Sequence, residues 1–248
     1  MGANVTAPKI GVEARISAAI NRLAAWVARH WLALFNLAVA VFIGLPFLAP
    51  VLMEAGLTGP ARAIYTIYAP TCHQLPERSF FLFGPLITPS VADLEASQAI
   101  PAGQSIIQHM ALRFPGTPAT GYKVAVCERD TAIYGAILLN GLLFGALRPT
   151  LRRRGRMPKM PLWLFALFVL PAAVDGFTQL FGLRESAWYL RLITGAIFGT
   201  GLVWLAYPFI EEAMNDVVRT SAPQRTSSPS REVTNIGPQT GQKAPPGV

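Results

Sequence analysis

The chain has 248 residues, of which 52% are hydrophobic and only 14% are charged. A soluble domain carries about 25% charged residues, so this composition disfavours a water-soluble globular protein, and the apolar content excludes disorder over most of the chain. The formal net charge of +8 does not indicate nucleic acid, because the basic residues cluster beside apolar runs, as they do in membrane proteins. We therefore expect the lipid bilayer as a partner and no nucleic acid.

Four apolar runs predict membrane-spanning helices. A helix needs about 20 mostly apolar residues to cross the hydrocarbon core of a bilayer. Runs that meet or approach this length predict spans at residues 32–53, 131–147, 160–181 and 188–210. The expected fold is an all-α bundle of four transmembrane helices, with an extracytoplasmic loop cap and a disordered C-terminal tail.

The segments around the spans divide the chain into three parts. Residues 1–30 contain arginines at helical spacing among apolar residues, which predicts an amphipathic segment on the cytoplasmic surface. Residues 31–212 form the membrane domain, in which residues 54–130 make a long outer loop. Residues 213–248 are rich in Pro, Ser and Gly, which is typical of a disordered cytoplasmic tail.

Basic residues predict the orientation of the spans. Residues 148–159, between the second and third spans, hold the densest basic cluster of the chain. Loops rich in Lys and Arg stay in the cytoplasm, so this loop should face inward. Four spans then place both termini in the cytoplasm and predict a multi-pass protein of the cell membrane.

Three short strings carry residues suited to chemistry. One is TCHQLPERSF at 71–80, another is VCERDTAIYG at 126–135, and the third combines DGFTQ at 175–179 with RLITG at 191–195. Together they resemble a prokaryotic domain-of-unknown-function family of small polytopic membrane proteins. Its hallmarks are a Cys-His-Gln string followed by Glu-Arg-Ser-Phe, and a Cys-x-Arg string leading into Ile-Tyr. The resemblance implies the topology and the location of a site, but no reaction.

The chain departs from the pattern of this family. Asp130 stands where the family commonly has a second cysteine, and Ala132 stands where it has a glycine. Residues 85–120 look like an insertion, rich in Pro, Gly and Ser. We expect the insertion to be an exposed loop, with His109 as an ordinary exposed histidine.

The two cysteines and a neighbouring histidine should lie at the outer rim of the bundle. Thiolate and imidazole ligands suit zinc or another transition metal, with Cys72, His73 and Cys127 as ligands and Asp130 supplying an oxygen. Two alternatives stay open. One is a structural disulfide between Cys72 and Cys127, which an oxidising outer compartment favours, and the other is a pair of free thiols.

Polar residues beside the cysteines complete a candidate polar site. Glu77, Arg78 and Arg129 are expected to form an ion-pair network that pins the loop over the helix ends, or else to bind an anionic headgroup or substrate. Gln74 and Tyr134 belong to the same strings and are included in the site.

A second set of polar residues lies within the spans. Asp175 and Gln179 are four residues apart and share a face of the third span, while Arg191 lies near the outer end of the fourth. An unpaired charge is costly in a membrane. We therefore expect Asp175 and Arg191 to meet, directly or through Gln179, beneath the cap. The pair could fix helix packing or act on a ligand.

The sequence favours a non-enzymatic membrane protein whose outer polar site binds a small ligand or a metal, or docks a partner. One alternative is a membrane redox enzyme that uses Cys72 and Cys127. Another is a small transporter with Asp175 and Arg191 at its site. Four spans would then need to form a homo-oligomer, for which the glycine pairs 141/145 and 195/199 offer close helix contact.

Overall fold

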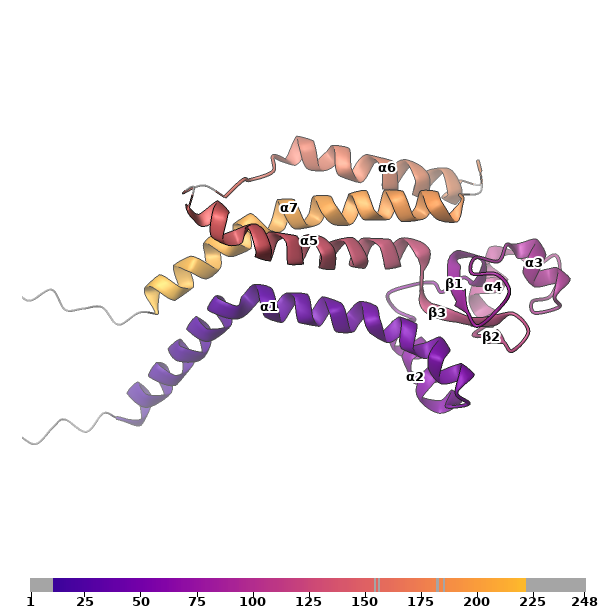
Figure 1. Cartoon of the computed structure of the whole chain (residues 1–248), viewed down its shortest axis with the longest axis horizontal. Helices are drawn as coiled ribbons and strands as arrows, with labels where there is room; N and C mark the ends of the chain where they lie inside the picture. Colours follow the sequence, from indigo (N-terminus) through magenta and orange to yellow (C-terminus); the bar gives the residue numbers. More distant parts are fainter. Residues whose placement is uncertain (1–10, 154, 156, 182, 185, 222–248) are drawn as a thin grey trace, which may run out of the picture.

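The computed structural model describes residues 11–221 apart from 154, 156, 182 and 185. Four long helices dominate it, and the remaining elements form a cap at one end of these helices (Figure 1). The long helices are α1 (Val12–Glu54), α5 (Glu128–Arg153), α6 (Leu162–Leu180) and α7 (Trp188–Thr220). Each is long and apolar enough to cross a membrane, as the four apolar runs predict.

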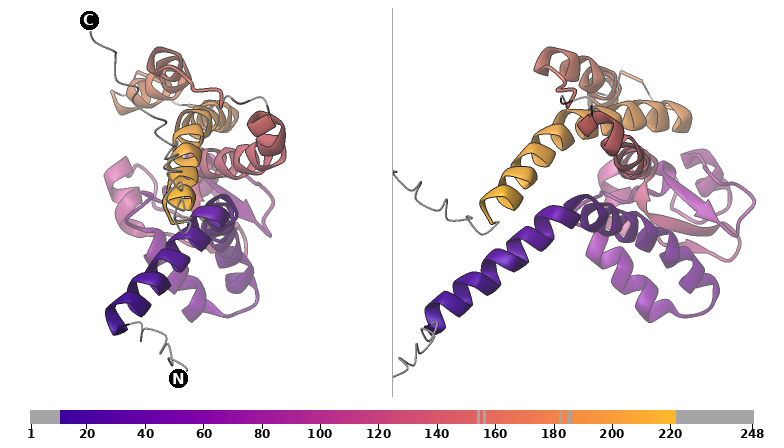
Figure 2. Two further views of the ribbon diagram at one scale, coloured as in Figure 1. Left: turned by 90° about the vertical axis from the view of Figure 1, so that its left-hand side faces the viewer. Right: turned by 60° about the vertical axis from the view of Figure 1, so that its left-hand side comes forward.

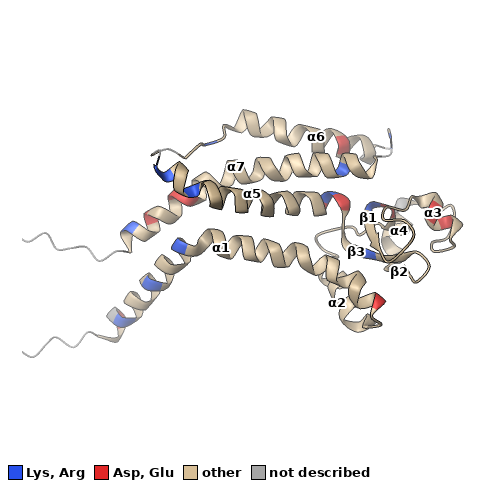
Figure 3. Cartoon of the chain, in the orientation of Figure 1, with Lys and Arg blue, Asp and Glu red and all other residues tan. Residues whose placement is uncertain are grey.

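The surface of the helices has the character that a bilayer requires. Charged residues are concentrated towards the helix ends, and the central parts are almost free of charge (Figure 3). Large apolar side chains are exposed there, among them Leu139, Leu167 and Leu170. Such a surface is stable in hydrocarbon and not in water. The chain is therefore a membrane protein with four apolar helices.

Two helices extend past the expected boundaries of the membrane domain. α1 is a single helix of 43 residues, so the amphipathic segment continues without a break into the first span. α7 extends to Thr220, beyond the expected start of the tail at residue 213. Residues 222–248, which make up most of the expected tail, lie outside the described residues.

α7 lies at the centre of the helix packing, because it contacts α1, α5 and α6. Two glycines let α7 approach α5 closely. A Cβ atom at Gly199 would lie 2.5 Å from the carbonyl oxygen of Ile133, and one at Gly195 would lie 2.8 Å from that of Arg129. The small residues at positions 195 and 199 therefore serve helix contact within the chain.

A proline inside the first helix is compensated by the cap. Pro46 lies within α1 and has no N–H group to donate to the carbonyl of Phe42, four residues earlier. The hydroxyl of Tyr68 donates to that carbonyl at 2.6 Å. Tyr68 is the last residue of α2 (Thr58–Tyr68), so an element of the cap satisfies a carbonyl freed in a span.

The end of the bundle away from the cap holds a buried carboxylate. Glu211 of α7 is fully buried, and it accepts hydrogen bonds from Trp31 Nε1 at 2.9 Å and from Arg148 Nε at 2.8 Å. It also pairs with Arg152. These bonds join α1, α5 and α7. The start of α1 and the end of α7 lie at this same end (Figure 2).

The cap contains a small antiparallel sheet, so the all-α expectation is incomplete. The strands lie in the order β1 (Ser79–Leu82), β3 (Gly121–Cys127) and β2 (Gly116–Thr117). β3 has the sequence GYKVAVC and is almost wholly buried, because it also packs against α1 and α2. Tyr and Val favour a pleated, buried surface of this kind. β3 leads directly into α5.

The insertion at 85–120 is a folded part of the cap rather than only an exposed loop. It contributes β2 and two short helices, α3 (Val91–Ala96) and α4 (Ile106–Leu112). Ser90 and Ser105 close a capping box at the start of each short helix. Leu94 and Ile100 are buried against Phe81 of β1, which gives the insertion its own apolar core.

Candidate functional site at the cap end of the bundle

The two strings at 71–80 and 126–135 meet where the cap joins the helices. β1 pairs with β3 in a register that places Ser79 opposite Cys127. The short 3-10 helix η1 (Pro76–Arg78) precedes β1, and β3 runs without a gap into α5. The sheet register therefore brings residues from both strings together.

Both cysteines carry free thiols and lie side by side. The Sγ atoms of Cys72 and Cys127 and a carboxylate oxygen of Asp130 all lie within 4.8 Å of one another. The backbone N–H of Cys127 donates to Cys72 Sγ at 3.2 Å, and that of Asp130 donates to Cys127 Sγ at 3.4 Å. Such N–H groups stabilise negative charge on sulfur.

The protonation of Cys127 is set by its partner and by burial. A hydrogen bond to Cys72 and the burial of the thiol raise the pKa of Cys127 well above its usual range. At neutral pH this group is therefore a neutral thiol when no other charge is bound. A bound cation would have to displace its proton.

His73 does not join the three ligand atoms, contrary to the expected ligand set. Cys72 and Gln74 are buried, whereas His73 is exposed. His73 lines a cavity of about 550 Å³ on the side of α2, which Cys72 and Gln74 also border.

Gln74 and Tyr134, which were also predicted for the site, contact the backbone of α2 and a ring of α1. The amide of Gln74 donates to the backbone carbonyl of Tyr65 at 2.7 Å. The ring of Tyr134 packs edge-on against Phe42, with 4.7 Å between the ring centroids. Gln74 therefore joins two segments of the cap, and Tyr134 packs α5 against α1.

A buried lysine, which we did not expect at this site, interacts electrostatically with Cys72. Lys123 of β3 is 0% exposed, and its ammonium group donates to the backbone carbonyl of Gln74 and lies 5.9 Å from the centroid of the Tyr65 ring. Burial lowers the pKa of Lys123 to about 8, while negative charge at Cys72 opposes this shift. A lysine inside an otherwise apolar strand was the only sequence signal for it.

Asp175 is held by four side chains. It is 1% exposed, and it pairs with Arg129 and with Arg184, whose Nη2 lies 2.7 Å from Asp175 Oδ1. The amide of Gln179 and the hydroxyl of Ser186 donate to Oδ2 at 3.0 and 3.1 Å. Asp175 and Gln179 therefore meet as expected, but the arginines that pair with Asp175 are not Arg191.

Arg191 pairs instead with Glu128, so the predicted pair with Asp175 is wrong. Arg191 Nε donates to Glu128 Oε2 at 2.7 Å, and both side chains are buried. The reason is the close contact of α5 and α7. Arg129 lies over Gly176 and Gly195, which gives it access to Asp175, and the preceding residue, Glu128, faces Arg191.

Glu77, Arg78 and Arg129 do not form the single ion-pair network that we expected, because their side chains have different neighbours. Glu77 Oε1 lies 3.5 Å from His109 Nδ1, and His109 is only 3% exposed, so it is not an ordinary surface histidine. Arg129 pairs with Asp175. Within the described residues the guanidinium of Arg78 forms no hydrogen bond or ion pair, and burial together with the nearby Arg191 lowers the pKa of Arg78.

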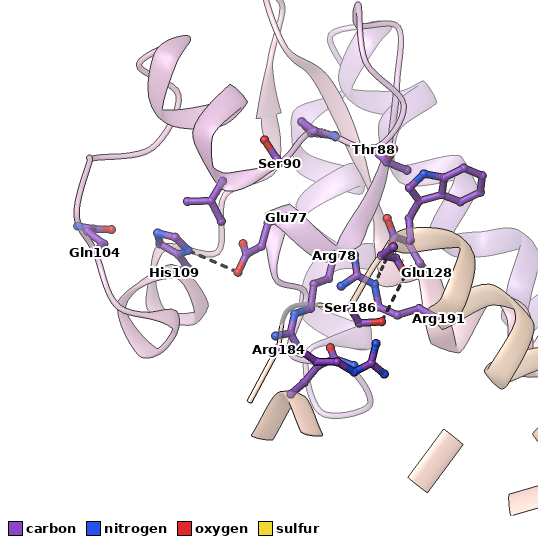
Figure 4. Close-up of a pocket in the computed structure, with 15 residues that line it drawn as sticks. Glu77, Arg78, Thr88, Ser90, Gln104, His109, Glu128, Arg184, Ser186 and Arg191 are labelled. Carbon is purple, nitrogen blue, oxygen red and sulfur yellow. Dashed lines mark hydrogen bonds and ion pairs between the residues drawn. The ribbon is translucent and has the colours of Figure 1, made fainter. Parts of the chain in front are cut away.

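Glu77, Arg78 and His109 line a cavity of about 730 Å³ between the cap and the ends of α6 and α7. Figure 4 shows Glu77 and His109 facing each other on the cap side, Arg78 in the middle, and Arg184 and the Glu128–Arg191 pair on the helix side. Four of the polar residues predicted for the site, Glu77, Arg78, Gln179 and Arg191, line it. The cysteines and Asp130 do not.

The fold and this end of the bundle define a polytopic membrane protein with four apolar helices and a polar cap. The chain belongs to the DUF2085 family, described as predicted membrane proteins, and the family pattern matches residues 118–205. That region includes Cys127, Asp175 and Arg191.

Two archaeal relatives are similar over much of their length. The uncharacterized protein MJ1492 of Methanocaldococcus jannaschii is 30% identical over 171 residues, which cover 67% of this chain and 83% of the relative. An uncharacterized protein of Methanothermobacter thermautotrophicus is 40% identical over 86 residues, which cover 34% of this chain and 71% of the relative. No solved structure matches the chain.

Proposed function

We propose that this protein is a multi-pass membrane protein that binds a thiophilic divalent metal ion, zinc, on its outer face. The ligands are Cys72, Cys127 and Asp130. The observation that supports this proposal is the clustering of two sulfurs and one carboxylate oxygen within 4.8 Å. Zinc binds Cys and Asp ligands at about 2.0–2.3 Å in a tetrahedral arrangement. The donor atoms of such a site lie within a few ångströms of one another, as these three atoms do.

The donor set and its surroundings favour zinc over harder cations. Two thiolates suit soft or borderline ions, whereas Mg²⁺ and Ca²⁺ require oxygen ligands. Two thiolates and a carboxylate around Zn²⁺ carry one excess negative charge, which the buried Lys123 is placed to balance. Three protein ligands leave a fourth position open for water or a further ligand, as in exchangeable or catalytic zinc sites.

The orientation is part of this proposal. The basic segment at 148–159 supports a cytoplasmic location for the end of the bundle that holds Glu211, which places both termini inside and the cap outside. The sheet and the metal ligands then face the extracytoplasmic space.

The test is elemental analysis combined with thiol counting on the purified full-length protein in detergent. We expect one zinc ion per chain and no reactive thiols until the metal is removed. Cys127→Ser and Asp130→Ala should lose zinc, and the matched variant His73→Ala should retain it. A metal-free wild-type protein after zinc supplementation, or zinc loss in His73→Ala alone, would contradict the site.

A reversible dithiol–disulfide couple is the second candidate function, and the adjacency of the two free thiols favours it. Oxidation would join the two sulfurs and release two electrons and two protons to a disulfide-bearing partner. Thiol counting separates the two functions, because a redox protein would lose both thiols on oxidation and regain them with dithiothreitol, without metal.

A further inference from the structure

We propose that the 730 Å³ cavity between the cap and the ends of α6 and α7 binds a small zwitterion. Its ligand would carry an anionic phosphate or carboxylate and an ammonium group a few bonds apart. This site is separate from the proposed metal site, because Cys72, Cys127 and Asp130 do not line the cavity. Its volume lies in the range of about 300–1,000 Å³ that is usual for small-molecule sites.

The positive pole of the cavity is Arg78. Its side chain is partly buried, and no described residue forms a hydrogen bond or ion pair with its guanidinium group. The other arginines of the cavity are engaged: Arg184 with Asp175 and Arg191 with Glu128. A guanidinium that has lost much of its water without gaining a partner is poised to bind an anion, and its planar donors match a phosphate or carboxylate.

The negative pole is Glu77. Its Oε1 faces His109, but Oε2 is buried and has no hydrogen-bond partner among the described residues. A buried carboxylate oxygen without a partner is costly, and a charged donor such as an ammonium group offsets that cost best. Since Glu77 and Arg78 are adjacent in η1, both poles lie on one short element.

Further unpartnered atoms surround the same cavity. Gln104 Oε1, Gln179 Oε1 and His109 Nε2 are buried and have no hydrogen-bond partner within the described part of the chain. All three residues line the cavity, and Figure 4 shows Gln104 and His109 on its cap side. The two amide oxygens can only accept hydrogen bonds, so they favour a ligand that donates hydrogen bonds. A simple inorganic anion would leave them unsatisfied.

The zwitterion could come from solution or from a lipid headgroup, and the experiment separates these sources. Full-length protein in detergent is titrated calorimetrically with phosphoethanolamine and L-serine as soluble zwitterions. Inorganic phosphate and ethanolamine serve as the two halves of the first probe. Dihexanoylphosphatidylethanolamine below its micellar concentration supplies the headgroup, with dihexanoylphosphatidylglycerol as the matched lipid without an amine.

We expect at least one zwitterionic probe to bind at least tenfold more tightly than phosphate or ethanolamine alone. Binding of the soluble probes identifies a free solute, and binding of the phosphatidylethanolamine alone identifies a headgroup. Arg78→Gln and Glu77→Gln should each weaken binding at least tenfold. Arg62→Gln and Glu54→Gln, at exposed positions outside the cavity, are the matched controls and should leave it unchanged.

Three results would overturn the site. These are binding of phosphate as tight as that of every zwitterion, unchanged affinity in Arg78→Gln or Glu77→Gln, and no binding of any probe. Thermal melting identifies variants that fail to fold. Arg78→Lys keeps the positive charge, so this variant should retain part of the affinity for the zwitterion. Because zinc content is measured separately, loss of the metal site would not mimic loss of this one.

Discussion

Arg191 Nε donates to Glu128 Oε2 at 2.7 Å, which joins the first turn of α7 to the first residue of α5. Both side chains are buried, so neither charge is compensated by bulk water. Removing one member of a buried ion pair leaves the other unpaired and costs about 3–5 kcal/mol, whereas removing both can be nearly neutral.

Glu128→Gln should therefore lower the thermal midpoint in detergent markedly, and the double change Glu128→Gln with Arg191→Gln should recover much of the loss. Asp175→Asn combined with Arg191→Gln should show no such recovery, because these two residues belong to different pairs. Recovery in the Asp175 double variant but not in the Glu128 one would contradict the observed pairing.

Gly199→Ala should destabilise the contact between α5 and α7. The new Cβ would lie 2.5 Å from the carbonyl oxygen of Ile133, so the helices would have to separate. Gly135→Ala is the matched control, because its Cβ would have nothing within 4 Å, and alanine is the better helix former by about 1 kcal/mol. We expect a lower melting midpoint for the first variant and an equal or higher one for the second. Equal effects would show that this helix contact is not tight.

Lys123 should make stability depend on alkaline pH. Its pKa is about 8 in the folded protein and 10.5 in the unfolded chain. Between these values the unfolded chain binds more protons, so stability rises with pH from about 8 to 10.5, by about 3 kcal/mol at 1.36 kcal/mol per pKa unit. Below pH 8 the contribution of this group is constant.

The measurement is the difference in melting midpoint between wild type and Lys123→Met from pH 7.5 to 10.5, since other groups titrate equally in both. The melting midpoint of the wild type should rise relative to that of Lys123→Met as the pH increases. A constant difference would mean that the ammonium group is not desolvated as the structure indicates.

Zinc affinity should increase with pH. The pKa of Cys127 is raised in the metal-free protein, so binding must release its proton. Release of one proton makes the apparent affinity about tenfold tighter per pH unit below that pKa. Competition with a chromophoric chelator between pH 6 and 8 measures the slope. A pH-independent affinity would exclude Cys127 as a ligand.

The orientation can be tested by cysteine labelling in a variant that carries Cys72→Ser and Cys127→Ser. Gln104→Cys in the cap should react with a membrane-impermeant maleimide in intact cells. Gly155→Cys, in the basic segment, should react only after lysis. The reverse pattern would invert the topology and place the cap, with its thiols, in the cytoplasm.

The sequence was sufficient to locate the membrane helices but not to pair their charges. Apolar runs are long and continuous, so all four spans coincide with helices in the structure. Three arginines, Arg129, Arg184 and Arg191, were available to Asp175. Periodicity gives each residue a helix face but not the rotation of one helix against another, which the glycines of α7 and α6 determine here.

The cap was harder to predict, for a related physical reason. The segment at 121–127 reads as part of a loop because it is short and contains a lysine, yet it becomes the buried central strand through contacts with β1 and α1 that are distant in sequence. His109 is buried by the same long-range packing. The proximity of Cys72 and Cys127 was predicted because their strings flank one loop, and the structure brings their sulfurs together.

The hydrogen bond from Tyr68 to the carbonyl of Phe42 has a consequence for biogenesis. Pro46 leaves the Phe42 carbonyl without a donor in its own helix, so this group depends on the hydroxyl of Tyr68, which lies outside the span. In hydrocarbon such a group costs several kcal/mol. The last turns of α1 therefore reach their final stability only after α2 has docked, so completion of the first span is coupled to the folding of the segment that follows it.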